Sequence, residues 1–168
     1  MVVLGIDPGV AITGFALVAG PPDDARLVAA GVIRTPAELP LAQRLQRLHD
    51  ELQRLLQEHR PDVAAIEELF FGRNARTALT VGHGRGVALL ALAQAGLTVY
   101  EYTPMHVKQA VVGYGQASKE QVQEMVRLLL RLNAVPQPDD AADAVAVALC
   151  HLQMARYTAL LGEAGLGR

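Results

Sequence analysis

Four acidic side chains are the strongest candidates for chemistry in this chain of 168 residues. Asp7 and Glu67 each close a short apolar run, VVLGID and DVAAIE, of the kind that forms a strand buried in a sheet. Asp140 and Asp143 lie three residues apart in the string DDAAD, and this spacing puts both on one face of a helix. A carboxylate is costly to bury unpaired, so the two strand-end acids should face a cleft.

Each acid alone also has an ordinary structural interpretation. A strand-end acid can cap a neighbouring helix or pair with an arginine, and aspartates favour helix N-termini through capping and the helix dipole. The helix that starts at the aspartate pair favours a functional role for the two acids. Val147, Cys150 and Met154 continue the helix face that carries them as a mostly apolar stripe. A capping acid usually looks outward, whereas this pair shares its face with residues suited to packing on a sheet.

Together, the four carboxylates could converge on a site for divalent cations. Like charges raise each other's pKa, and a bound cation is the stable way to keep such a cluster ionised. Hard oxygen ligands favour Mg²⁺, with Mn²⁺ as a substitute. Two such ions, roughly 4 Å apart, clamp the attacking and leaving oxygens of a phosphodiester. The acids therefore predict hydrolysis of a phosphodiester by water, with two metal ions and no protein nucleophile.

Neighbouring acids leave two of these assignments open. Glu68 follows Glu67, and strand alternation lets only one of the two face the site. Asp139 precedes Asp140 and lies four residues before Asp143, which is also a spacing found on one helical face.

Basic side chains supply candidates for binding the substrate. The only two lysines, Lys108 and Lys119, flank the loop GYG, and each lies near the end of a predicted helix. Arg73, Arg76 and Arg85 follow the strand that ends at the candidate glutamate. Cations in these positions could hold the phosphates of a nucleic acid, although the net charge of −2 and a pI of about 6.2 give no sign of such a partner.

Two adjacent aromatic residues come directly after the same strand. Core packing explains one of Phe70 and Phe71, but two neighbours in a turn cannot both point inward easily. An exposed ring beside Arg73 and Asn74 would suit stacking on a nucleobase.

The apolar periodicity predicts the elements that position these residues. Apolar runs bounded by turns predict strands over 2–7, 12–19, 26–34, 62–67 and 97–102. Spacings of three and four, a Ser118–Gln121 capping box and proline breaks predict helices over 41–59, 75–95, 105–112, 118–132 and 139–160. We therefore expect one α/β domain over 1–168, with a mixed five-stranded sheet, three antiparallel strands first, flanked by helices. Residues 158–168 are expected to form a loosely ordered tail.

Composition narrows the class of protein further. Hydrophobic residues make up 51% of the chain and charged residues 19%, which is typical of a globular domain and excludes disorder. The single cysteine, Cys150, excludes an internal disulfide and a cysteine-rich metal site. The first residues lack the pattern of a secretory signal, so we expect a cytoplasmic protein without a membrane partner.

Four ordered motifs bring a known family into view. GIDPG, AIEELFFGRNA, VKQAVVGYG followed by SKEQVQ, and DDAADAVAVA resemble, in order and spacing, the RuvC-type Holliday junction resolvases of bacteria. The resemblance spans about residues 1–157. It implies an RNase H-like fold and a Mg²⁺-dependent endodeoxyribonuclease that resolves four-way junctions in DNA recombination and repair by paired, symmetric nicks.

The resemblance also implies roles for individual residues and partners. The catalytic, metal-binding acids fall on Asp7, Glu67, Asp140 and Asp143, so the resemblance favours Glu67 over Glu68 and Asp140 over Asp139, and the important lysines fall on Lys108 and Lys119. The aromatic wedge that disrupts base pairing falls on Phe70, and Arg73, Asn74 and Arg76 follow it as further DNA-binding candidates. The implied partners are junction DNA, a second copy of the chain, and a branch-migration complex of a junction-binding protein and an ATPase motor. The sparsely charged helix over 75–95 is the expected dimer interface.

Three other classes of protein share part of this pattern. An RNase H-like nuclease acting on RNA or an RNA–DNA hybrid would use the same acids. An actin-like ATPase also opens with an acid and glycines after its first strand, but it needs two such domains, for which 168 residues are too few. A non-catalytic junction-binding module would gain nothing from a negative cleft against phosphates.

Overall fold

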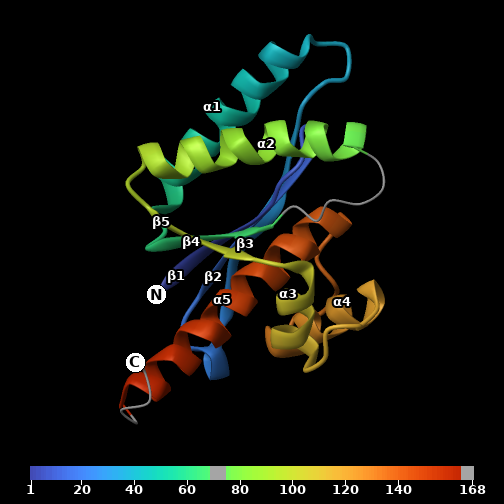
Figure 1. Ribbon diagram of the computed structural model, residues 1–168. Helices are drawn as coiled ribbons and strands as arrows, with labels where there is room; N and C mark the ends of the chain where they lie inside the picture. Colours follow the sequence, from blue (N-terminus) through green and yellow to red (C-terminus); the bar gives the residue numbers. More distant parts are fainter. Residues whose placement is uncertain (69–74, 164–168) are drawn as a thin grey trace.

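A mixed five-stranded sheet forms the centre of the computed structural model, which describes residues 1–68 and 75–163 (Figure 1). The strands are β1 (Val2–Asp7), β2 (Ile12–Ala19), β3 (Arg26–Arg34), β4 (Val63–Glu67) and β5 (Thr98–Tyr102). Their order across the sheet is β3-β2-β1-β4-β5. β1 to β3 form an antiparallel meander, and β4 and β5 continue the sheet parallel to β1. The predicted sheet is confirmed.

Helices cover both faces of this sheet (Figure 1). They are α1 (Leu41–His59) and α2 (Ala75–Gln94) on one face, and α3 (Pro104–Val112), α4 (Lys119–Leu129) and α5 (Asp139–Glu163) on the other. A short 3-10 helix, Pro22–Asp24, joins β2 to β3. The capping box of Ser118 and Gln121 is confirmed at the start of α4. That helix ends before the predicted residue 132, because Arg131 turns into the left-handed region with a φ of 53°.

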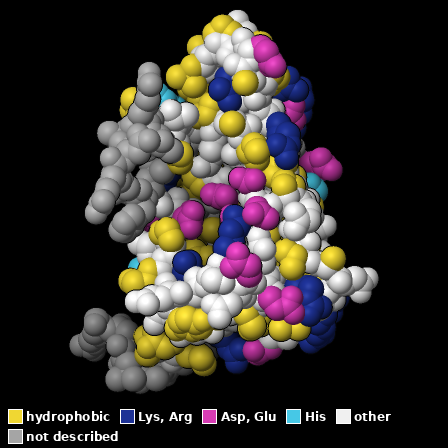
Figure 2. Space-filling model, turned by 90° about the vertical axis from the view of Figure 1, so that its right-hand side faces the viewer, with side chains coloured by type: hydrophobic (Ala, Val, Ile, Leu, Met, Phe, Trp, Pro, Cys, Tyr) yellow, Lys and Arg dark blue, Asp and Glu magenta, His cyan; other side chains and the backbone are white. Residues whose placement is uncertain are grey.

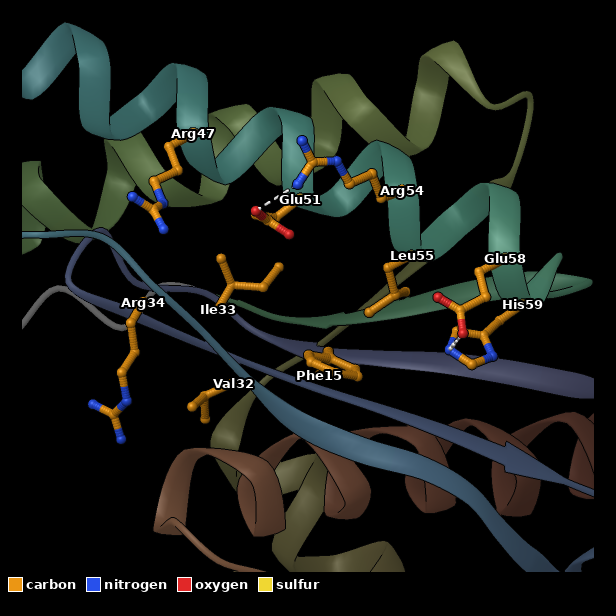
Figure 3. Close-up of a pocket in the computed structure, with 10 residues that line it drawn as sticks. All are labelled: Phe15, Val32, Ile33, Arg34, Arg47, Glu51, Arg54, Leu55, Glu58 and His59. Carbon is orange, nitrogen blue, oxygen red and sulfur yellow. Dashed lines mark hydrogen bonds and ion pairs between the residues drawn. The ribbon is translucent and has the colours of Figure 1, made fainter.

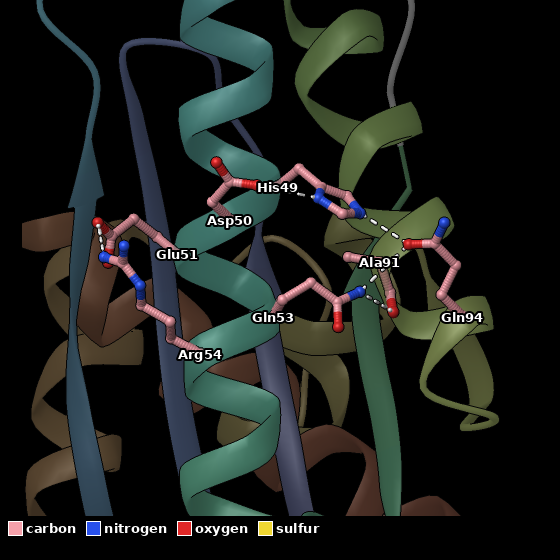
Figure 4. Close-up of polar contacts among 7 residues, drawn as sticks. All are labelled: His49, Asp50, Glu51, Gln53, Arg54, Ala91 and Gln94. Carbon is pink, nitrogen blue, oxygen red and sulfur yellow. Dashed lines mark hydrogen bonds and ion pairs between the residues drawn. The ribbon is translucent and has the colours of Figure 1, made fainter.

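Strand alternation divides the apolar side chains between two cores. Leu4 and Ile6 of β1 face the leucines of α1 and the small residues of α2, while Val3 of the same strand faces α5. Polar contacts also tie α1 to α2, since His49 Nε2 lies 2.7 Å from Gln94 Oε1 and Gln53 donates to the Ala91 carbonyl at 3.3 Å (Figure 4). These contacts join the two helices that cover one face of the sheet.

Two glycines let α5 approach the sheet closely. A Cβ atom at Gly5 would collide with the Ala144 carbonyl, and one at Gly14 would collide with the Asp140 carbonyl. Both positions lie on the face that carries Asp7, because Gly14 is the register partner of Asp7 in β2. The N-terminal turn of α5 is consequently held over the end of β1.

α5 is also long and apolar enough, by length and composition, to cross a membrane. Half of an 18-residue window within Asp139–Leu161 is buried inside the fold, where the helix packs across the sheet. A core helix passes the same test, and α5 occupies that position here.

Candidate active site

Asp7 and Glu67 lie side by side at the ends of two neighbouring strands. β1 and β4 run parallel with Ile6 opposite Ile66, so the next residue of each strand is an acid at the same edge of the sheet. Gly5 and Ala65, two residues earlier, pack against the α5 side, and both acids therefore point to that side. The expected convergence of the two strand-end carboxylates is present.

The acids of α5 complete the cluster from above. Asp140 and Asp143 are half-buried on the first turns of the helix, over the ends of β1 and β4. Burial raises the pKa of Asp7 to about 7, and the charges of Glu67, Asp143 and Asp140 raise it as well. These effects on the pKa of Asp7 show that the other three carboxylates lie within electrostatic range of it.

The same repulsion acts on the other members of the cluster. Burial and the charge of Asp143 raise the pKa of Glu67 to about 6, although Lys119 and Lys108 act in the opposite direction. Burial also raises the pKa of Asp143 above its ordinary value, against the lowering effect of its hydrogen bond with Lys119. Keeping these carboxylates ionised therefore costs free energy, and a cation bound among them would lower that cost.

Lys119 is the cation that occupies the cluster in this structure. Its Nζ lies 2.8 Å from Asp143 Oδ2 and 3.4 Å from Asp139 Oδ2. Burial lowers the pKa of Lys119, but the hydrogen bonds and charges of the two aspartates outweigh it and raise the pKa overall. Among the described residues no three His, Cys, Asp or Glu side chains come close enough to hold a metal ion as they stand.

The four acids nevertheless fit a divalent metal in their chemistry. They offer only hard oxygen donors, and burial and mutual repulsion raise the pKa of three of them. The ammonium group of Lys119 already pairs with Asp143, as expected of a cluster of acids that favours bound cations. Metal binding there would require Lys119 to release Asp143.

The geometry separates the alternatives that sequence alone left open. Asp139 is more exposed than Asp143 and accepts a hydrogen bond from Gln123 at 3.2 Å, while Asp140 acts on the Asp7 charge. Glu68 is exposed, and its backbone N–H donates to the Tyr102 carbonyl at the sheet edge. The arrangement therefore favours Asp140 and Glu67 as members of the site.

The two lysines lie on one flank of the acids. Lys108 on α3 and Lys119 on α4 line a pocket of about 260 Å³ together with Glu67 and Asp143. Apolar residues form the rest of its wall, namely Pro104, Val107, Val122 and Ala146. A phosphate beside the acids would meet two positive charges on this side, as the sequence predicts.

The remaining predicted DNA contacts have different outcomes. Phe70, Arg73 and Asn74 lie outside the described residues, and Arg76 belongs to α2 with a side chain that is not described. Arg85 is bound within the protein and has a structural role. It forms an ion pair with Glu101 and donates a hydrogen bond to the Glu67 carbonyl at 3.3 Å. It therefore braces the backbone of a candidate ligand.

The sequence reasoning assigned no role to one supporting residue. Thr13 is almost fully buried, donates its hydroxyl to the Gly9 carbonyl at 2.5 Å and lies 3.3 Å from the Gly9 N–H. These contacts close the turn directly after Asp7. The buried position of a hydroxyl next to a glycine turn was the available signal.

The fold and this cluster define the class of protein as RNase H-like, with acids from two adjacent strand ends and one helix over them. Residues 3–151 match the family described as crossover junction endodeoxyribonuclease RuvC. The chain belongs to the RuvC family.

Relatives and solved structures agree with this assignment over nearly the whole chain. The crossover junction endodeoxyribonuclease RuvC of Roseiflexus sp. is 61% identical over 148 residues, which cover 88% of each chain. That of Ruminiclostridium cellulolyticum is 52% identical and covers 97% of this chain and 98% of the relative. The structure of Thermus thermophilus RuvC in complex with a Holliday junction substrate matches with a TM-score of 0.89 at 43% identity, covering 94% of this chain and 96% of that one.

Proposed function

We propose that this chain is the endonuclease that resolves four-way DNA junctions by paired, symmetric nicks in recombination and repair. The observation that carries the proposal is the cluster of Asp7, Glu67, Asp140 and Asp143 in a fold that matches a junction-bound RuvC structure. The named relatives are crossover junction endodeoxyribonucleases. A nuclease for RNA or hybrids would share the acids, so the substrate must be tested directly.

The four carboxylates would hold Mg²⁺, two ions per site, with Mn²⁺ as a substitute. The metal supplies charge stabilisation for the phosphodiester and a water of lowered pKa. The acids of this chain would keep the ions beside the scissile phosphate. No side chain of the protein would then have to form a covalent bond with the DNA. Lys119 and Lys108 would neutralise the phosphate from one flank.

The partners follow from the substrate and from an exposed helix face. A junction with near two-fold symmetry suits an isologous dimer that presents two copies of one site. Leu79 and Leu90 of α2 are exposed and lie three helical turns apart, which supports α2 as the interface. We further propose that the protein acts in the cytoplasm with a branch-migration complex as its partner. Phe70 is the proposed wedge between base pairs, and its neighbours Arg73, Asn74 and Arg76 are proposed to bind DNA.

Cleavage of four substrates tests the proposal. The protein is incubated with Mg²⁺ and a four-way junction, a duplex, a single strand or an RNA–DNA hybrid of matched sequence. Symmetric nicks confined to the junction support the proposed activity. Equal cleavage of the hybrid, or binding of the junction without any metal-dependent cleavage, would contradict it.

A further inference from the structure

A groove of about 500 Å³ lies between α1 and β3, on the side of the sheet away from the two lysines (Figure 3). Its floor is apolar, with Phe15, Ile33 and Leu55. Two arginines stand at one end of it (Figure 3). Arg47 extends from α1 toward the sheet, whereas Arg34 extends from the edge strand β3 away from α1, toward the face that carries α5. Neither arginine belongs to the site described above.

These two arginines differ from the other charged residues of the groove. Arg54 pairs with Glu51 at 2.9 Å, and Glu58 lies 3.9 Å from His59 (Figures 3 and 4). Arg34 and Arg47 are exposed and form no ion pair or hydrogen bond with any described residue. Their positive charge is therefore available to an external anion.

Arg34 lies at the same edge of the sheet as the acids. Asp7 of β1 lies opposite Gly14 of β2. Two residues away from Gly14 on the same strand, Ile12 lies opposite Arg34 of β3. Residues two apart on a strand share a face, so Arg34 projects to the α5 side, as Asp7 does. Two strand spacings separate β1 from β3, which amounts to roughly 10 Å.

The backbone around the arginines is held rigidly against the active-site turn. Thr35, next to Arg34, donates its hydroxyl to the Val10 carbonyl at 2.6 Å. Arg44, one turn before Arg47, donates its Nε to the same hydroxyl at 2.9 Å. The end of β3, the start of α1 and the turn after β1 thus form one unit, and the two free arginines have a fixed position relative to the acids.

We propose that Arg34 and Arg47 bind backbone phosphates of the DNA on the flank of the acids opposite Lys108 and Lys119. This inference rests on the proposed junction-cleaving function and deepens it. A strand that crosses the carboxylates would then meet cations on both sides, and Figure 2 shows Lys and Arg side chains both above and below the central group of acids. Phosphodiester DNA is favoured over an acidic protein segment because Arg34 lies on the same face and at the same strand ends as the acids that would engage the scissile phosphate.

Salt dependence of junction binding tests the proposal with matched controls. Arg34→Gln and Arg47→Gln are compared with Arg26→Gln, at the far end of β3, and Arg54→Gln, which is already paired with Glu51. A fluorescent four-way junction is titrated in EDTA at several salt concentrations. Each lost phosphate contact should lower the slope of log K against log salt by about 0.9.

The expected result has a second, kinetic part. Arg34→Gln and Arg47→Gln should weaken junction binding about three- to tenfold near 0.1 M salt, and should raise KM while leaving kcat at saturating junction within about twofold. The control variants should keep the wild-type slope. Melting temperatures are measured alongside, so that a loss of folding is recognised.

Two outcomes are decisive in different ways. If the wild type neither binds nor cleaves junctions, the proposed function itself fails. If the wild type is active but the Arg34 and Arg47 variants keep the slope of the Arg26 and Arg54 controls, the phosphate contacts are overturned and the groove is left to an acidic protein segment. A loss of affinity with an unchanged salt slope also overturns them.

Discussion

The ammonium group of Lys119 lies 2.8 Å from Asp143 Oδ2, inside the group of acids that would bind metal. A lysine in this position neutralises part of the carboxylate charge before any metal or DNA arrives. We propose that it leaves Asp143 when a metal ion binds there and then meets a phosphate. Lys119 would thus compete with the metal in the free protein and assist the reaction in the complex.

Removing this lysine should therefore have opposite effects on metal binding and on cleavage. Lys119→Met should bind Mn²⁺ or Mg²⁺ about two- to fivefold more tightly at pH 8, because a partly exposed ion pair is worth about 0.2–1 kcal/mol. Cleavage of the junction should nevertheless fall. Calorimetric titration of the DNA-free protein measures the first effect, with Lys108→Met as the control. Weaker metal binding by Lys119→Met would contradict this role.

The raised pKa values predict how stability depends on pH without metal. Asp7 titrates near 7 and Glu67 near 6 in the fold, against 3.8 and 4.5 as ordinary values. The folded state holds protons that the unfolded chain releases, so these groups should make the protein less stable as pH rises from about 4 to about 7. Mg²⁺ should restore stability most strongly above pH 7, where the carboxylates are ionised.

Urea unfolding at several pH values, in EDTA and in Mg²⁺, checks this prediction. Asp7→Asn removes the charge that is most costly to bury, and should stabilise the metal-free protein at pH 8 by on the order of 1–3 kcal/mol. Other acids are unchanged in that variant, so the difference isolates Asp7. A variant less stable than the wild type at pH 8 in EDTA would argue against the cluster.

Adjacent acids provide matched pairs for the assignment of ligands. Glu67→Gln and Asp140→Asn should each abolish most cleavage, whereas Glu68→Gln and Asp139→Asn should retain at least about a tenth of it. The reason is that the charges of Glu67 and Asp140 act on the cluster of buried acids, Asp140 on Asp7 and Glu67 on Asp7 as well, whereas Glu68 and Asp139 are exposed and no effect of theirs on the pKa of Asp7 is found. Initial rates with saturating Mg²⁺ measure the effect. A reversed order within either pair would change the assignment.

Phe70→Ala tests the proposed wedge. Stacking of a base on an aromatic ring is worth about 1–3 kcal/mol, so junction resolution should fall about ten- to a hundredfold while duplex binding changes little. A core position for Phe70 predicts instead a loss of about 3–5 kcal/mol in stability, with every activity falling together. A thermal melt beside the cleavage assay separates the two, and a large drop in melting temperature would make Phe71 the candidate.

The sheet and the acid cluster could be predicted because they depend on short-range patterns. Strand ends and helix spacing place Asp7 and Glu67 at the ends of two strands and the acids of DDAAD on one face of a helix. Only the parallel pairing of β1 with β4 had to be supplied by the fold. The close approach of α5 at Gly5 and Gly14 then fixes the height of the helix above the strands.

Contacts between distant side chains could not be predicted in the same way. Arg85 has the sequence context of a substrate ligand, yet the fold pairs it with Glu101 and the Glu67 backbone. Arg34 is an ordinary residue at the end of a strand until the register of β1, β2 and β3 sets it on the same face as Asp7. Such relationships depend on strand order and long side chains, which local patterns do not encode.

The most direct test of the whole account is Asp7→Asn measured for cleavage and for binding of a four-way junction in the same preparation. The carboxylate would hold metal and would repel phosphate, so its removal should lower Mg²⁺-dependent cleavage on the order of a thousandfold or more, while junction affinity in EDTA stays equal or rises. Turnover close to that of the wild type would contradict the assignment of this acid cluster as the active site.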